Sequence, residues 1–187
     1  MNNKNIYSKY LAKIVKLIKE IDYKNINSFV KLIKKKSKNK KNIFVFGNGG
    51  SASTANHFAV DMTKNAKIRT QTFSNDNLIT CFSNDYGFEK WILNCIKSYV
   101  QKDDLVIFIS VSGNSKNLVN AVKYCKKNKI YSYSLTGVKK NNQLNKLSDE
   151  YFWVNSKSYN QVEIIHHIIM LLVVDLIIGR DNYGPNL

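Results

Sequence analysis

The chain contains little proline and little cysteine. Its 187 residues include one proline and no Pro-rich or Gly/Ser-rich stretch, so nothing indicates a linker or a second domain. The three cysteines, Cys81, Cys95 and Cys125, have neither CxxC spacing nor an even count. This pattern argues against a disulfide framework and a cysteine-rich zinc site, and it predicts reduced, buried thiols in a cytoplasmic protein.

A secretion signal and a clear membrane span are also lacking. The N-terminus is polar and lysine-rich, without an apolar stretch ahead of a small-residue cleavage site. The most apolar segment, residues 162–179, carries Glu163, Asp175 and two histidines, unlike a clean membrane span of about 20 apolar residues. We expect a buried helix that packs against other helices or subunits, and no membrane partner.

Arginine and acidic residues are scarce, although the chain is strongly basic. It has 29 Lys and Arg residues against 13 Asp and Glu, for a net charge of +16. Such a charge suggests nucleic acid, but only Arg69 and Arg180 are arginines, and base readers and phosphate clamps favour arginine. We therefore expect no nucleic-acid partner. The densest run, KKKSKNKK at residues 34–41, is interpreted as a solvated face, with contact to an acidic partner as the alternative.

Apolar periodicity predicts an alternation of helices and strands. Two amphipathic helices, over residues 5–21 and 26–37, precede every strand. Strands are predicted over 42–47, 104–110, 129–137 and 150–155, with 69–74 as a further candidate, and later helices over 51–63, 87–100, 115–127 and 160–178. Continuous apolar strands alternating with helices indicate an α/β fold with a parallel sheet covered on both faces. We predict a single domain over residues 1–187, with the two helices in 1–40 and the α/β core in 41–187.

Glycines and serines follow two of the predicted strands. GNGGS (Gly47–Ser51) ends the first strand, and SVSGNS (Ser110–Ser115) ends the second. Glycine lets backbone N–H groups approach an anion, serine hydroxyls donate further hydrogen bonds, and the following helix adds the positive end of its dipole. The lysine of GxxxxGK[ST] and the spacing of GxGxxG are both missing. The pair of loops therefore predicts a phosphomonoester site, with ordinary strand-to-helix turns as the alternative.

Longer motifs resemble a known family. The stretches GNGGSASTANHFAVDM, SNDYGF and ISVSGNSKNLVNAV resemble the sugar isomerase (SIS) family, and within it the phosphoheptose isomerases. The resemblance implies a flavodoxin-like three-layer sandwich with a five-stranded parallel sheet. It also implies a homotetramer with a bundle of N- and C-terminal helices and sites at subunit interfaces. The substrate-binding residues implied are Asn48, Gly49, Ser51, Asp85, Ser110, Ser112 and Ser115.

A histidine and an aspartate lie four residues apart on the helix after GNGGS. His57 and Asp61 share one face of that helix, and two turns along it match the distance to the far end of a phosphorylated sugar. A structural or solvent-exposed pair is the alternative. In the resembling isomerases these positions hold a His and a Glu that bind zinc, and the Glu also transfers protons. Asp61 replaces that Glu, so its oxygens sit about one methylene further back.

The closing helix departs from the family pattern. The resembling isomerases present a Gln and, eight residues later, a His; here Glu163 and Leu171 fall at these positions. The expected acid/base histidine is therefore missing, and His166 or His167 could turn toward the site instead. A carboxylate in so apolar a helix should be paired, metal-bound or protonated. We accordingly expect His57, Asp61 and Glu163 to hold a zinc ion, and Asp61, Glu163 and His166 to act in catalysis.

Two function classes follow from these motifs. The resemblance implies an aldose–ketose isomerase that converts sedoheptulose 7-phosphate to D-glycero-D-manno-heptose 7-phosphate for surface polysaccharide synthesis. Such a reaction needs a base at carbon and an acid or metal at the carbonyl oxygen. The alternative is a SIS module that binds a phosphosugar or a protein partner without turnover, since a fold does not determine a function. Both classes would use the same phosphate loops.

Overall fold

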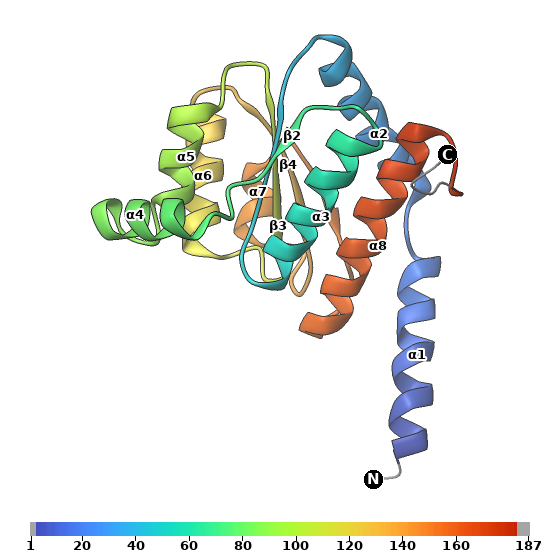
Figure 1. Cartoon of the computed structure of the whole chain (residues 1–187). Helices are drawn as coiled ribbons and strands as arrows, with labels where there is room; N and C mark the ends of the chain where they lie inside the picture. The colour runs from blue at the N-terminus through green and yellow to red at the C-terminus, as the bar shows by residue number, and fades with distance from the viewer. Residues whose placement is uncertain (1–2, 183–187) are drawn as a thin grey trace.

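The computed structural model describes residues 3–182, which form a three-layer α/β sandwich (Figure 1). The central sheet has five parallel strands in the order β2-β1-β3-β4-β5. The strands are β1 (Ile43–Gly47), β2 (Thr70–Gln71), β3 (Leu105–Ser110), β4 (Tyr131–Thr136) and β5 (Glu150–Trp153). The helices are α1 (Asn3–Lys19), α2 (Tyr23–Lys38), α3 (Gly50–Lys64), α4 (Asp76–Tyr86), α5 (Trp91–Tyr99), α6 (Lys116–Lys127), α7 (Gln143–Leu147) and α8 (Tyr159–Ile178). The flavodoxin-like fold expected from the sequence is confirmed.

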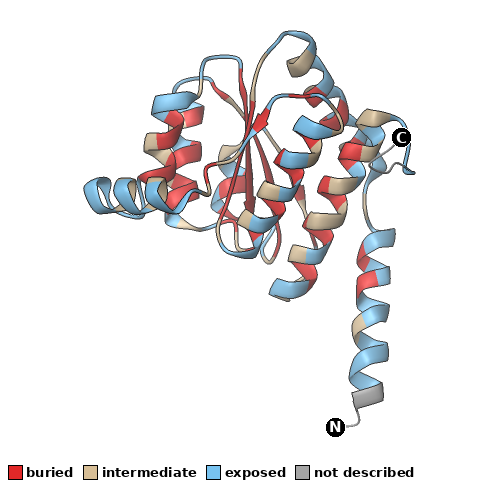
Figure 2. Cartoon of the chain, in the orientation of Figure 1, coloured by how far each residue is buried: buried red, intermediate tan, exposed pale blue. Residues whose placement is uncertain are grey.

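Two hydrophobic cores lie on the two faces of the sheet. Side chains alternate between the faces of a strand, so in β1 Ile43 and Val45 join one core while Phe44 and Phe46 join the other. Helices α2, α3 and α8 cover the first face, and α5, α6 and α7 cover the second. Figure 2 shows the central strands buried and the outer helix faces exposed. Burial of both faces explains why β1 and β3 have continuous apolar sequences.

Two helices and part of a third differ from the sequence-based prediction. Helix α4 was not expected; its apolar residues Leu78, Ile79 and Phe82 are only partly buried against the second core, in a helix of eleven residues, so its apolar period is short. Helix α7 has only five residues, which is too short for a periodic signal. The helix expected over 87–100 begins at Trp91, and the candidate strand over 69–74 shortens to Thr70–Gln71 at the sheet edge.

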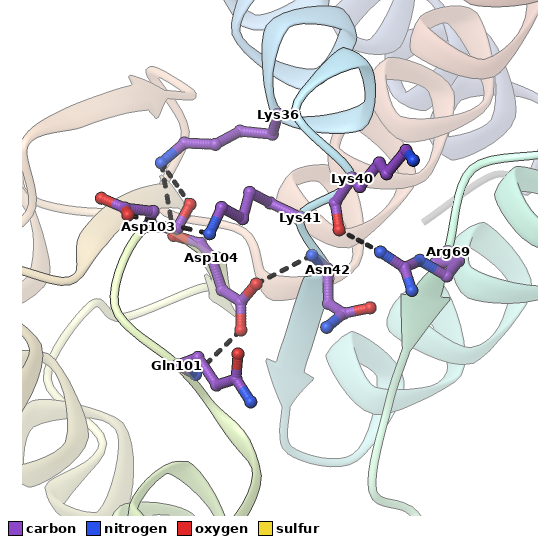
Figure 3. Close-up of polar contacts among 8 residues, drawn as sticks. All are labelled: Lys36, Lys40, Lys41, Asn42, Arg69, Gln101, Asp103 and Asp104. Atoms are coloured by element: carbon purple, nitrogen blue, oxygen red, sulfur yellow. Dashed lines mark hydrogen bonds and ion pairs between the residues drawn. The ribbon is translucent and has the colours of Figure 1, made fainter.

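The lysine-rich run ends at the amino edge of the sheet (Figure 3). The buried Asp104 side chain accepts hydrogen bonds from the backbone N–H groups of Asn42 and Gln101, both at 2.8 Å. The Lys36 ammonium donates to the Asp103 carbonyl oxygen at 2.7 Å, and Lys41 lies 3.8 Å from the Asp103 carboxylate. Part of the run therefore serves to join α2 to the loop before β3, and this edge lies at the end of the strands opposite the serine loops.

Helix α8 is a core helix, as the sequence predicts. In residues 3–182 it is the one helix whose length and apolar content would suffice to cross a membrane. Its buried side chains include Val162, Ile165, Ile169 and Val173, which pack in the core that α2 and α3 share with the sheet. The opposite side of α8 stays partly open, because Leu172 and Leu176 remain 37% and 40% exposed.

Candidate active site

A small pocket lies at the carboxyl ends of β1 and β3. Strand β2 is added on one side of β1 and strand β3 on the other, so the order of strand addition reverses between β1 and β3. Ligands of open α/β sheets bind at such a switch point. The pocket is lined by Asn48, Ser51, Ile109, Ser110, Val111, Ser112, Ser115, Tyr159 and Glu163. Its volume of about 120 Å³ is small beside the roughly 300–1,000 Å³ of typical ligand sites. It therefore suits one end of a ligand, such as a phosphate group.

The loop after β3 presents serine hydroxyls to this pocket. The Ser110 hydroxyl accepts a hydrogen bond from the Gly113 N–H at 3.1 Å, and the Ser112 hydroxyl accepts one from the Asn114 N–H at 3.2 Å. Accepting these bonds leaves the hydroxyl hydrogen of Ser112 for a ligand and that of Ser110 for a ligand or for Ser115. Ser115 is the N-cap residue of α6, but its side chain makes no capping hydrogen bond. Its hydroxyl oxygen lies 3.5 Å from that of Ser110.

Glycine is required at one position of this loop. Gly113 has φ +64°, a left-handed conformation that favours glycine, and a β-carbon there would lie 2.2 Å from the Asn142 side chain. Asn142 is buried and caps α7 by accepting a hydrogen bond from the Asn145 N–H. The close approach of Gly113 and Asn142 ties the serine loop to the turn after β4.

An asparagine pair joins the two loops. The side chains of Asn48 and Asn117 exchange two hydrogen bonds, of 3.0 and 2.9 Å, and Asn117 also accepts from the Leu118 N–H. Asn117 is 2% exposed, so its contribution is to hold Asn48 at the wall of the pocket. Asn117 and the pocket residue Tyr159 were not among the site residues predicted from the sequence. The place of Asn117, two residues after Ser115 in the first turn of α6, was the available signal.

Glu163 lines the phosphate pocket instead of lying in the apolar interior. Its carboxylate covers Gly50 at the start of α3, where an added β-carbon would come within 2.7 to 2.8 Å of the carboxylate atoms. The N-terminus of a helix stabilises a negative charge, which accounts for this placement. Since no lysine or arginine lines the pocket, Glu163 would repel a bound phosphate. We expect the phosphate to lie nearer the Ser110–Ser115 loop.

The side chains of His57 and Asp61 contact each other on α3. The His57 Nε2 atom lies 3.3 Å from the Asp61 carboxylate, whose other oxygen accepts from the Asn65 amide at 3.1 Å. The His57 side chain is 49% exposed and that of Asp61 18%. His167 of α8 joins this pair, because its ring centroid lies 5.1 Å from that of His57. Burial, followed by the charge of His57, lowers the pKa of His167, while Asp61 opposes the shift.

The three residues expected to bind zinc are not brought together within one chain. Glu163 lies beside Gly50, whereas His57 is seven residues further along α3, about 10 Å along the helix axis. In the described part of the chain, no three His, Cys, Asp or Glu side chains lie close enough to share a metal ion. The donor set of a single chain therefore does not fit the expected zinc site.

Two other expected site residues also lie elsewhere. His166 is 1% exposed, and its Nε2 atom lies 3.1 Å from the Thr136 carbonyl oxygen. It does not line the pocket, so its contacts support a structural role in place of the expected catalytic one. Asp85 is exposed on α4, which projects from the body of the chain (Figure 1). Its contacts are with neighbours on the same helix, Asn84 and Cys81.

The serine loop can be tested with inorganic phosphate. We expect Ser112→Ala and Ser115→Ala each to weaken phosphate binding by about 1 to 3 kcal/mol, the usual cost of losing a hydrogen bond to a charged group. Isothermal titration calorimetry measures the change. Ser98→Ala is the matched control, since that hydroxyl donates to the Asn94 carbonyl oxygen on α5. Unchanged affinity in both loop variants would contradict the placement of the phosphate.

Comparison with known proteins places the chain in a family. Residues 6–137 match the SIS domain model. Phosphoheptose isomerase from Fusobacterium nucleatum is 32% identical over 140 residues, with 72% of each chain covered. Phosphoheptose isomerase 2 from Campylobacter jejuni is 32% identical over 200 aligned positions, covering 96% of this chain and 97% of the relative. A solved phosphoheptose isomerase from Neisseria gonorrhoeae, 23% identical, shares the fold with a TM-score of 0.89, over 95% of this chain and 100% of that one. The chain therefore belongs to the SIS domain family and, within it, groups with the phosphoheptose isomerases.

Proposed function

We propose that this protein is an aldose–ketose isomerase that converts sedoheptulose 7-phosphate to D-glycero-D-manno-heptose 7-phosphate. The observation that carries the proposal is the convergence of the loops after β1 and β3 on one pocket, in a chain whose relatives are named phosphoheptose isomerases. Ser110, Ser112 and Ser115 would donate to the phosphate. The small volume of the pocket leaves the sugar to extend out of it, past the first turns of α3 and α8.

The reacting end of the sugar would then lie near the His57–Asp61 pair. Isomerisation moves a proton between two neighbouring carbons through an enediol, so it needs a base at carbon and a donor at oxygen. The Asp61 carboxylate is a candidate base, held beside His57 and Asn65. Glu163 is a second carboxylate, in the wall of the phosphate pocket, which would accept hydrogen bonds from sugar hydroxyls.

The test is an assay of the purified protein with sedoheptulose 7-phosphate in deuterated water. Nuclear magnetic resonance follows both the aldose product and deuterium entry at C1, with parallel samples that contain added zinc or a chelator. Product formation with deuterium at C1 supports the isomerase. If the protein binds the sugar phosphate but exchanges no C1 proton in any sample, it is a binding module without turnover.

The proposed assembly is a homotetramer in the cytoplasm. Helix α1 extends away from the body of the chain (Figure 1), and its apolar residues Ile6, Leu11, Val15 and Ile18 are 40 to 50% exposed. Together with the open side of α8, these residues leave apolar side chains exposed that the helices of neighbouring subunits would cover. In a tetramer, Asp85 on the projecting α4 could reach the site of a neighbouring subunit. Cys95 and Cys125 are buried thiols, as predicted, whereas Cys81 is exposed; the free thiols support a reducing compartment.

Light scattering tests the assembly. At micromolar protein concentration a tetramer should have a mass of about 86 kDa, which is four times the 21.5 kDa of one chain. Replacing Leu11 by Lys places a charge in the exposed apolar stripe of α1 and should shift the mass toward that of smaller species. A wild-type mass equal to one chain would refute the tetramer.

A further inference from the structure

The Glu163 carboxylate faces the phosphate pocket without a hydrogen-bond partner of its own. Its side chain is half-buried and lies over Gly50, where α8 packs beside α3 (Figure 1). Within residues 3–182, no backbone or side-chain group donates a hydrogen bond to it. A carboxylate is an acceptor only, so a ligand in this pocket would have to supply the missing donor.

The surroundings of Glu163 do not neutralise its charge. No lysine or arginine lines the pocket, and its other titratable side chain is Tyr159, one turn earlier on α8. Lys116 at the start of α6 is not part of the lining. The next titratable groups along α3 and α8 that are not turned into the core are His57 and His167. The N-terminus of α3 supplies about half a positive charge, which leaves part of the negative charge beside the pocket.

A phosphate monoester has two charge forms near neutral pH. Its second pKa is about 6, so the dianion predominates at pH 8 and the monoanion at lower pH. A pocket of about 120 Å³ leaves a phosphate no position far from Glu163, and like charges a few ångströms apart repel each other strongly. The monoanion has less charge and carries one P–OH group. That group is a donor for the carboxylate, while the other non-bridging oxygens accept from the serine loop.

We propose that Glu163 is a specificity-determining residue that selects the monoanion of a phosphate monoester, by accepting a hydrogen bond from its P–OH group. This inference rests on the phosphate placement of the proposed function. Glu163 and the bound phosphate then hold one proton between them, and this proton belongs to the pair. When the free ligand is a dianion, binding takes up that proton from the solvent.

The experiment titrates methyl phosphate by calorimetry between pH 6 and pH 8. Wild-type affinity should fall at least about tenfold over this interval, because the apparent affinity follows the fraction of ligand in the competent form. Glu163→Gln offers an amide that donates to the dianion. Its affinity should vary less than about threefold with pH, and at pH 8 it should exceed that of the wild type at least about tenfold. Asp103→Asn removes one negative charge at the opposite edge of the sheet and should keep the wild-type profile.

Two further measurements locate the proton. Titrations at pH 8 in buffers of different ionisation enthalpy should show uptake of about one proton per ligand by the wild type, and close to none by Glu163→Gln. Sulfate remains a dianion over this interval and has no proton to donate. At pH 6 it should bind the wild type at least about tenfold more weakly than methyl phosphate does, whereas Glu163→Gln should bind both with similar affinity.

The outcomes separate this inference from the proposed function. If the pH dependence persists in Glu163→Gln, a group such as His57 or His167 is its source, and the role of Glu163 is refuted. Equal wild-type affinities for sulfate and methyl phosphate at pH 6 would refute it as well. A flat wild-type profile together with C1 exchange in the sedoheptulose 7-phosphate assay overturns this inference and leaves the isomerase.

The converse result and a folding failure are also informative. A proton-coupled profile without C1 exchange supports the role of Glu163 at the pocket and refutes the isomerase. If neither ligand binds the wild type, the phosphate placement and this inference fail together. Circular dichroism verifies that each variant folds. Should Glu163→Gln not fold, proton uptake by the wild type decides, and an uptake of zero overturns the proposal.

Discussion

Replacing Asp61 by Asn is expected to lower turnover of sedoheptulose 7-phosphate at least about a hundredfold, within the range for a lost general base. The amide can still hydrogen-bond His57 and Asn65, so the local structure should persist, but it cannot accept a proton from carbon. Phosphate affinity should change little, because Asp61 lies eleven residues along the chain from Gly50, about 16 Å along the axis of α3. Steady-state kinetics and phosphate titration measure the two effects separately.

The matched control for this variant is Asp103→Asn. Asp103 is exposed and lies at the amino edge of the sheet, where it pairs with Lys41 (Figure 3). An exposed ion pair contributes little stability, so turnover should stay within about twofold of the wild type. If Asp61→Asn retained more than about a tenth of the wild-type kcat, Asp61 would not be the base, and Glu163 would be the carboxylate to examine next.

Acid is expected to destabilise the fold through His166. Complete burial lowers the pKa of His166 from 6.5 to about 4, although the hydrogen bond to the Thr136 carbonyl oxygen acts in the opposite direction. In the unfolded chain the ring takes up a proton near pH 6.5, whereas in the folded chain it stays neutral down to about pH 4. The stability that neutral His166 provides is therefore present above pH 6.5 and is lost as the pH falls to about 4.

The expected loss is about 3 kcal/mol of unfolding free energy across this interval. Urea denaturation at a series of pH values measures it. His166→Leu removes the ring, and its unfolding free energy should depend less steeply on pH between 6.5 and 4, whatever its absolute stability. His57→Leu, which removes a histidine at an exposed site, is the comparison variant. The slope of its unfolding free energy against pH should differ from that of His166→Leu. Equal slopes for the wild type and His166→Leu would contradict this account of His166.

Much of the fold could be predicted from local patterns. Strands β1 and β3 are apolar on both faces, and GNGGS and SVSGNS mark the points where they end. Helix α4 escaped prediction because it is short and its apolar residues Leu78, Ile79 and Phe82 are only partly buried. A periodic pattern records burial, and a short element with partial burial leaves a weak record.

The phosphate pocket could likewise be predicted from the sequence. Carboxyl ends of neighbouring parallel strands meet at one edge of a sheet, so two serine-rich loops after two such strands predict one shared site. Asn48, Ser51, Ser110, Ser112 and Ser115 all line the pocket. Chain order and strand direction are enough to bring them together.

The residues at the far end of the site could be placed only from the packing of α3 against α8. Helix α8 is apolar on most of its surface, so its sequence does not reveal which side faces the sheet, or whether His166, which was predicted to be catalytic, or His167 faces α3. The structure turns His166 toward Thr136 and His167 toward Thr54, and it sets Glu163 opposite Gly50 instead of beside His57. Residue spacing along one helix specifies which side chains share a face. The rotation of that helix and its offset along a neighbour depend on the fit of side chains from distant parts of the chain, and these two quantities determine which residues of α8 meet α3.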